Sequence, residues 1–149
     1  MGMRANLTIL SPSDVTAASD WSDEQIYERL TSADAVEIDK SWEVAFPLIG
    51  QIAGTGMMLT DNAAPIGGEL VFGPAMIVDA TEVATINSAL VGVDDDHAAA
   101  QLATLSSPFM ATGPDDDEGR SFGLWGFRET ANVFAAAARD SSAVLFAIL

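Results

Sequence analysis

Apolar and polar residues recur at regular intervals along most of the chain, and their spacing predicts four strands separated by helices. Residues 4–10 and 36–39 alternate in polarity, as a half-buried strand does, and residues 75–78 are a short apolar run. Residues 143–149 (AVLFAIL) are apolar throughout, which is typical of a strand that is covered on both faces. We therefore expect a small sheet whose last strand is buried.

Helix-start signals stand in front of the apolar stripes between these strands. Ser11 precedes Pro12, which suits a first helical position, and Ser22 with Gln25 has the spacing of a capping box. Three consecutive acids at 94–96 suit the positive end of a helix dipole. The predicted helices begin near residues 12, 23, 42, 80, 94 and 124.

Proline and glycine mark the breaks in this pattern. Ser41 is expected to cap a helix that Pro47 then kinks or splits near Phe46, because proline lacks the N–H of a helical residue. Residues 61–68 and 113–119 (GPDDDEG) are predicted as loops. The 149 residues thus predict a single compact domain of α/β type, with α+β as the other arrangement, built on a small mixed sheet of about four strands.

Acidic residues dominate the charge of the chain. The sequence has 22 Asp and Glu against 6 Lys and Arg, which gives a formal net charge of −16, and it has no cysteine. Nucleic-acid binding needs clustered Lys and Arg, and anionic membranes repel an acidic surface, so we expect no nucleic-acid and no membrane partner. Disulfides, thiolate nucleophiles and sulfur-ligated zinc sites are excluded because they require cysteine.

No targeting segment is recognisable in the sequence. The first ten residues are too short and too mixed in polarity for a secretory signal. No apolar run approaches the roughly 18 residues that a membrane span needs. We expect a cytoplasmic protein.

Catalytic and metal-binding templates are not matched. The chain contains no Gly-x-Ser-x-Gly, no phosphate-binding Gly-x-x-x-x-Gly-Lys and no His-Glu-x-x-His. His97, the one imidazole, follows three aspartates at a predicted helix start, and we interpret it as solvated rather than catalytic. The acid runs 94–96 and 115–118 lack the spacing of a calcium loop. We predict no catalytic residue, no metal site and no cofactor.

Asp39-Lys40-Ser41-Trp42 is the most distinctive local feature, because it places the single lysine at a predicted strand-to-helix turn. In a functional interpretation, Lys40 binds a ligand carboxylate or phosphate at this turn. In a structural interpretation, which we favour, Lys40 pairs with nearby acids while Trp42 packs beneath the sheet and its indole N–H meets a carbonyl. The functional interpretation predicts a ligand site made by this segment and two glycine-rich turns: Asp39, Lys40, Trp42, Gly67, Gly68 and Gly73.

Several segments, in a fixed order along the chain, resemble the YfbM-like family of small bacterial proteins, which is classed as a domain of unknown function. The resemblance rests on the opening Met1-Gly2-Met3, on Ile38-Asp39-Lys40-Ser41-Trp42 and on Leu48-Ile49-Gly50. It continues through residues 65–69, 72–75, 82–83, 134–138 and 143–145. The resemblance implies a compact α/β domain, and it brings no established activity or catalytic residue to any position.

The chain departs from the family pattern in two places. Residues 110–119 form a polar acidic segment where family members tend to have an aromatic-proline pair. Pro47 interrupts a helix that is usually continuous. Both departures concern local geometry more than the fold.

Three functional hypotheses follow. The leading one is a non-enzymatic binding module that captures a basic protein by complementary charge, for example an immunity-type protein that masks the active site of a basic, nucleic-acid-degrading toxin. The alternative is an enzyme or small-ligand-binding protein whose site surrounds Asp39, Lys40 and the turns at Gly67, Gly68 and Gly73. The third treats the acidity as adaptation to high salt and implies no partner. Oligomeric state is left open.

Overall fold

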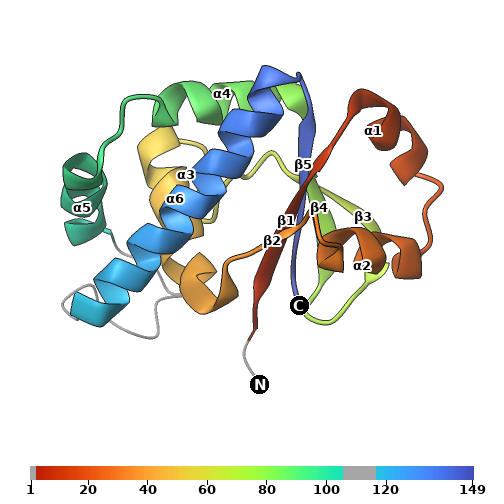
Figure 1. The fold of residues 1–149 in the computed structure, drawn as a ribbon, viewed down its shortest axis with the longest axis horizontal. Coiled ribbons are helices and arrows are strands. Elements are labelled where there is room, and N and C mark those ends of the chain that lie inside the picture. Colours follow the sequence, from red (N-terminus) through yellow and green to blue (C-terminus); the bar gives the residue numbers. More distant parts are fainter. Residues whose placement is uncertain (1–2, 106–116) are drawn as a thin grey trace.

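The apolar C-terminal run forms β5 (Ala143–Ile148), the central strand of a five-stranded sheet in the order β2-β1-β5-β4-β3. The structure, a computed structural model, describes residues 3–105 and 117–149. Helices cover both faces of the sheet (Figure 1), which explains why β5 is apolar at every position. The other strands are β1 (Ala5–Leu10), β2 (Val36–Glu37), β3 (Ala64–Glu69) and β4 (Pro74–Val78).

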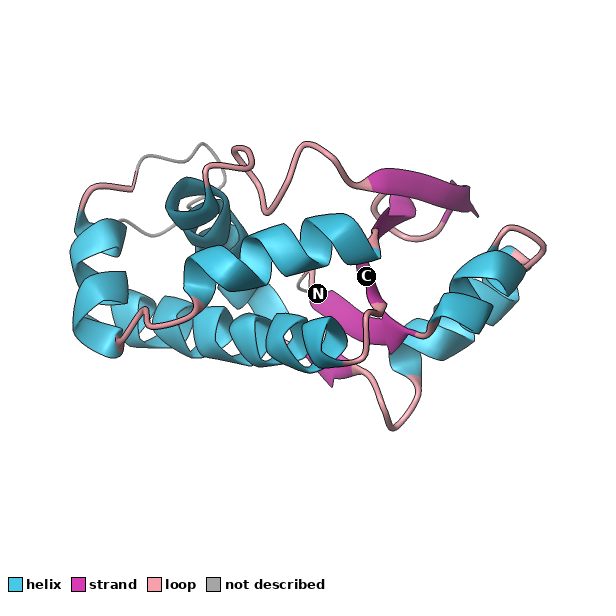
Figure 2. Ribbon diagram, turned by 90° about the horizontal axis from the view of Figure 1, so that it is seen from above, coloured by secondary structure: helices cyan, strands magenta, loops and turns pink. Residues whose placement is uncertain are grey.

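Two groups of helices lie on opposite sides of the sheet (Figure 1). The larger hydrophobic core lies beneath four of them: α3 (Trp42–Ala53), α4 (Ala80–Leu90), α5 (Asp95–Ala103) and α6 (Asp117–Arg139). A smaller core on the other side is covered by α1 (Pro12–Ala18) and α2 (Asp23–Thr31). The 3-10 helix η1 (Asp39–Ser41) connects β2 to α3, and α6 runs beside α4 (Figure 2). The result is one compact α/β domain, as the residue patterns predict.

Every strand pair in the described sheet is antiparallel, so the expected mixed sheet of about four strands is corrected to an antiparallel sheet of five. β1 and β5 pair along their whole length, from Ala5 with Ile148 to Leu10 with Ala143. The direction of a strand depends on the end of the sheet at which the chain enters that strand after the preceding helix. Residue periodicity does not encode that end, which is why it predicted the direction wrongly.

The additional strand is β3, which lies largely in a segment predicted as a loop. Pro65, Gly67 and Gly68 disfavour a central strand, but β3 is at the edge of the sheet, where proline and a bulge are tolerated. Its register with β4 shifts between Ile66 and Glu69. Because β3 is mostly exposed, it lacks the apolar alternation that would have revealed it.

Side-chain caps confirm most of the predicted helix starts. Ser11 caps α1, and Ser22 and Gln25 form the predicted capping box at the start of α2. Asp79 caps α4 and Asp94 caps α5 through their carboxylates. These starts were predictable because a cap acts within one turn of its own helix.

α3 departs from the prediction at two positions. The Ser41 hydroxyl donates to the Ile38 carbonyl oxygen and makes no side-chain cap for α3. α3 continues through Pro47, so the proline does not split the helix. The loss of one helical hydrogen bond is offset by burial on both sides of the proline, because Phe46 and Leu48 are fully buried.

α6 begins at Asp117, earlier than the predicted start near residue 124. Residues 117–119, predicted as part of a loop, are therefore helical, and residues 113–116 of that loop lie outside the described residues. Glycines hid this part of the helix, because glycine lowers helix propensity by about 1 kcal/mol relative to alanine. In the described residues, no helix is both long enough and apolar enough to cross a bilayer.

Two glycines of α6 make close packing against the preceding elements possible. A β-carbon at Gly123 would lie 2.5 Å from Val44 Cγ1, and one at Gly126 would lie 2.6 Å from Ser41 Cβ. The absence of these β-carbons lets α6 approach α3 and η1 closely. Helix propensity is therefore overridden by tertiary packing at these positions.

Candidate functional site

Asp39 and Lys40 lie in η1, directly after the edge strand β2. Asp39 adopts a φ of 50°, a left-handed conformation that Asp tolerates, and its Oδ1 accepts the Lys40 backbone N–H at 2.8 Å. Both side chains are exposed, and Lys40 makes no ion pair with the described acids. The ion pair that the structural interpretation expects for Lys40 is therefore missing from this part of the chain.

Trp42, at the start of α3, belongs to the larger core. It is 6% exposed, and its Nε1 donates to the Met3 carbonyl oxygen at 3.1 Å. Its ring centre lies 6.5 Å from that of Phe46. The structural interpretation of Trp42 is confirmed, because its ring is buried and its indole N–H meets a backbone carbonyl.

Gly67 and Gly68 lie in the bulged part of β3, against α2. The Gly68 N–H donates to Asp23 Oδ1 at 2.8 Å. A β-carbon at Gly67, where φ is +67°, would lie 2.7 Å from Ile26 Cδ1, and one at Gly68 would lie 2.8 Å from Asp23 Oδ2. These glycines let α2 pack closely on the edge of the sheet.

Gly73 belongs to the turn between β3 and β4. Its φ is +102°, a conformation that favours glycine, and there is open space where a β-carbon would be. The Leu70 N–H donates to the Gly73 carbonyl oxygen at 3.0 Å and closes the turn. The backbone of the hairpin is therefore sufficient reason for glycine at this position.

The two halves of the predicted ligand site lie apart. Asp39 and Lys40 follow β2 at one edge of the sheet, whereas the three glycines belong to β3 and its turn at the other edge. Four interstrand steps of about 4.8 Å separate the two edge strands by about 19 Å. The structure therefore does not bring Lys40 together with Gly67, Gly68 and Gly73.

A groove that sequence reasoning missed lies between β1 and α2. It has a volume of about 330 Å³ and is lined by Thr8, Ile9, Arg29, Ser32 and Asp34. Thr8 is 4% exposed, and its hydroxyl makes no hydrogen bond with the described residues. No fully buried polar side-chain atom among those residues lacks a partner, so this hydroxyl reaches the open groove.

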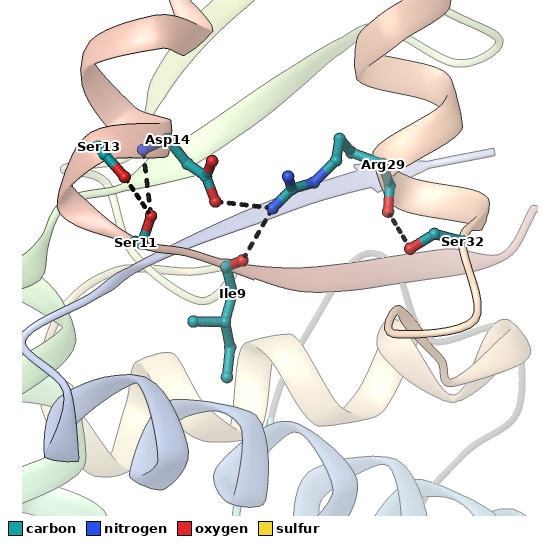
Figure 3. A network of polar contacts seen from close by, with 6 residues as sticks. All are labelled: Ile9, Ser11, Ser13, Asp14, Arg29 and Ser32. Carbon is teal, nitrogen blue, oxygen red and sulfur yellow. Dashed lines mark hydrogen bonds and ion pairs between the residues drawn. The ribbon is translucent and has the colours of Figure 1, made fainter.

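Arg29 connects α2 to α1 and β1 beside this groove (Figure 3). Its Nη2 donates to Asp14 Oδ2 at 2.9 Å and, at the longer distance of 3.5 Å, to the Ile9 carbonyl oxygen. The guanidinium carbon lies 5.3 Å from the ring centre of Trp21, within the range of a cation–π contact. Arg29 thus holds three elements of the smaller layer together.

The pKa of Asp14 is lowered by this arrangement. Partial burial by itself raises the pKa of Asp14, but the hydrogen bond and positive charge of Arg29 lower it more, and hydrogen bonds with Ser11 add to the decrease. The pKa therefore lies below its ordinary value of 3.8. Asp14 is charged at neutral pH and remains a partner for Arg29.

Arg29 in this groove is better explained by its contacts with α1 and β1 than by the binding of an anion. Arg29 is the one cation there, and two carboxylates, Asp14 and Asp34, accompany it. Asp14 and Arg29 stand on different helices, and only the packing of α1 and α2 on β1 brings their side chains to 2.9 Å. No local sequence signal could have found this pair.

Exposed acids gather on α2 and the turn before it; we call this group the α2 acidic surface, and it consists of Asp20, Asp23, Glu24 and Glu28. None of the four pairs with a base in the described residues. Tyr27 and Glu28 follow Glu24 by three and four residues, so each is a neighbour of Glu24 on the helix surface. Tyr27 is 45% exposed, whereas Ile26 and Leu30 of the same helix are fully buried in the smaller core.

Four of the six basic side chains pair with acids that do not belong to this surface, and one of the four, Arg29, stands on α2 itself. These ion pairs are Arg4 with Glu37, Arg29 with Asp14, Arg120 with Asp117, and Arg128 with Asp95. The four acids of the α2 acidic surface therefore make no ion pair in the described chain, and the one base on this helix, Arg29, is paired with Asp14.

His97 and the acids before it belong to the start of α5. Asp94 Oδ1 accepts the His97 backbone N–H at 2.8 Å, and Asp95 pairs with Arg128 at 3.1 Å. Across residues 3–105 and 117–149, no three His, Cys, Asp or Glu side chains are grouped so that they could hold a metal ion. Asp115 and Asp116 of the second acid run lie outside these residues.

A family model described as "Domain of unknown function (DUF1877)" matches residues 1–147. The chain belongs to this family. The crystal structure of YfbM from Escherichia coli, a protein of unknown function, has a similar fold, with a TM-score of 0.62 over 99% of this chain and 100% of that one. The two are 15% identical in sequence, so the similarity concerns the fold alone. No curated protein matches this chain.

Several residues that carry the resemblance to the DUF1877 family occupy tightly packed positions. Gly50 lies against the carbonyl of Gly56, so the loop after α3 crosses where a β-carbon would otherwise be. Ser41 and Gly126 meet at the crossing of η1 and α6. Lys40 differs from these, because it is exposed and no ion pair in the described chain explains it.

Proposed function

We propose that this member of the DUF1877 family is a non-enzymatic binding module for a basic protein. The observation that carries the proposal is the α2 acidic surface, where exposed acids stand without a basic partner on an ordered helix. The net charge of −16 also attracts a basic protein at long range. Complementary charge raises association rates between proteins and selects against acidic partners.

Tyr27 adds a contact that charge alone does not provide. It lies one turn after Glu24 in α2 and is 45% exposed. An arginine or lysine that approaches the Glu24 carboxylate can also stack on the tyrosine ring. Tyrosine is among the residue types that contribute most to binding energy at protein interfaces.

A specific form of this proposal is an immunity-type role, in which the partner is a basic, nucleic-acid-degrading toxin. The active site of such an enzyme is positively charged because it binds a phosphate backbone. An acidic surface that covers the active site would exclude the nucleic acid. The test is whether the chain inhibits cleavage by a nuclease encoded beside its own gene, and unchanged cleavage by such a nuclease would contradict this form.

The general proposal is tested with an arginine-rich peptide as a probe, by fluorescence anisotropy. The double variant Glu24→Lys/Glu28→Lys should weaken binding about tenfold or more, because it reverses two charges on the proposed surface. The control, Asp96→Lys/Asp140→Lys, changes the net charge equally at exposed positions on other elements. Equal weakening by both variants would show that only total charge matters, and absence of binding by the native chain would contradict the proposal.

The second candidate is a small-ligand site, and the exposed, unpaired ammonium of Lys40 in the described chain favours it. In this candidate the site consists of Asp39 and Lys40, because the glycines lie at the other edge of the sheet. A panel of small carboxylates and phosphates is screened by thermal shift. A ligand that stabilises the native chain and not Lys40→Ala would support this candidate, and no stabilisation would contradict it.

A further inference from the structure

Val71 and Phe72 are adjacent apolar residues at the tip of the β3–β4 hairpin, and they are 55% and 50% exposed. They occupy the middle of the turn that Leu70 and Gly73 close. Turn centres usually carry Gly, Pro, Asn, Asp or Ser, and valine and phenylalanine have neither their backbone freedom nor their local hydrogen bonds. These two residues depart from the turn preference although their side chains are not buried. Such departures are typical of functional positions.

The hairpin tip is held next to α2. Leu70 packs against the smaller core, which contains Ile26 of α2. The hydrogen bond between Gly68 and Asp23 fixes β3 to the same helix. The tip therefore has a defined position beside the start of α2, where Asp23 lies, and Figure 1 shows the hairpin turn below that helix.

Acids border this apolar tip. Glu69 is exposed and precedes the turn by one residue, and Asp23 contacts the strand at Gly68. Neither the hairpin nor the segment 19–28 contains a lysine or arginine, and the next residue, Arg29, is paired with Asp14. An apolar centre with a charged border is the composition of a protein-binding surface, in which the centre supplies binding energy and the border supplies selectivity.

We propose that Val71 and Phe72, together with the α2 acidic surface and Glu69, form the docking surface for a basic protein that presents an apolar residue among its lysines and arginines. This inference rests on the proposed function and adds the location and the apolar contact. A second copy of the chain is disfavoured as the occupant, because each copy carries a charge of −16 and would bring acids against acids. An anionic membrane is disfavoured for the same reason.

The experiment compares two synthetic peptides of equal charge, one alternating arginine with leucine and the other alternating arginine with serine. The native chain should bind the arginine–leucine peptide about tenfold more tightly. The variant Val71→Ser/Phe72→Asn should lose this difference while it still binds both peptides, because the acids are unchanged. Its turn residues are ones that turns favour, so it should fold at least as well as the native chain.

Two controls separate the explanations. Met57→Ser removes an apolar side chain that is 66% exposed in the loop before β3, at the opposite end of that strand from the tip, and it should keep the preference for leucine. Glu24→Lys/Glu69→Lys should weaken the binding of both peptides.

The possible contrary results distinguish failure of the docking surface from failure of the proposed function. A preference for leucine that survives Val71→Ser/Phe72→Asn would overturn the docking surface and leave the proposed function intact. Failure of the native chain to bind either peptide would instead remove the proposed function. A dimer that is lost in Val71→Ser/Phe72→Asn, measured by light scattering, would assign the surface to a second copy and contradict a basic partner.

Discussion

Lys40 and Trp42 are two residues apart in the sequence and have opposite roles in the structure. Trp42 is buried and hydrogen-bonded to Met3, whereas Lys40 is exposed. Trp42→Ala should lower the free energy of unfolding by about 3–5 kcal/mol, because it removes a large ring from the core. Lys40→Ala should change it by less than about 0.5 kcal/mol. Urea denaturation measures both values, and a large loss for Lys40→Ala would mean that this lysine has a structural partner.

Gly126 is the residue whose replacement separates helix propensity from packing most clearly. In an isolated helix, Gly126→Ala would be stabilising by about 0.5–1 kcal/mol. In this chain the new β-carbon would lie 2.6 Å from Ser41 Cβ, so the variant should instead lose about 1–3 kcal/mol of stability.

A double-mutant cycle tests the cause of that loss. Ser41→Gly removes the atoms that the alanine would strike, so Ser41→Gly/Gly126→Ala should recover most of the loss relative to Ser41→Gly alone. Additive effects of the two changes would show that the loss arises elsewhere.

At the scale of elements, α2 is the helix that connects the most separate features of the smaller layer. Asp23 at its start holds β3, Arg29 near its end holds α1 and β1, and its exposed face carries the acids. The capping box and the buried pair Ile26 and Leu30 were predictable, because they are local to the helix. The contacts with β3 and α1 were not, because they join residues far apart along the chain.

The ion pair between Asp14 and Arg29 predicts a pH dependence of stability. The pKa of Asp14 is lower in the folded state than its ordinary value of 3.8, so the pair stabilises the folded state above that value. Its contribution is lost as the pH falls through the folded-state pKa. Both side chains are about one third exposed (31% and 37%), which limits the contribution to about 1 kcal/mol or less.

Asp14→Asn provides the measurement. The native chain should exceed this variant in unfolding free energy near neutral pH, and the difference should shrink below about pH 4. Because both chains share all other acids, the difference isolates Asp14. A difference that stays constant down to about pH 2 would contradict this account.

At the scale of the whole molecule, the charge of −16 opposes the compact state by self-repulsion. Several acids offset part of this cost locally, because Asp79 and Asp94 cap helices and Asp95 pairs with Arg128. We therefore expect the chain to stay folded at about 50 mM salt and to gain modest stability as salt screens the repulsion. Thermal unfolding over a salt series checks this, and unfolding at low salt would favour the high-salt hypothesis.

The features that act within a few residues were predictable from the sequence alone. These are the helix caps at Ser11 and Ser22, the buried C-terminal strand, the α/β class and the resemblance to the family. The residues that form a cap or a periodic apolar stripe lie close together in the sequence, so their pattern can be recognised there.

Contacts between distant residues became known from the tertiary structure. It made the sheet antiparallel, placed β3 at an edge despite its glycines, and separated Lys40 from Gly67 by the width of the sheet. It also brought Arg29 to Asp14, and it brought Leu70 of the hairpin to the core that contains Ile26 of α2. Each of these depends on how helices and strands pack, and the free energy of that packing is a property of pairs of elements that no single segment carries.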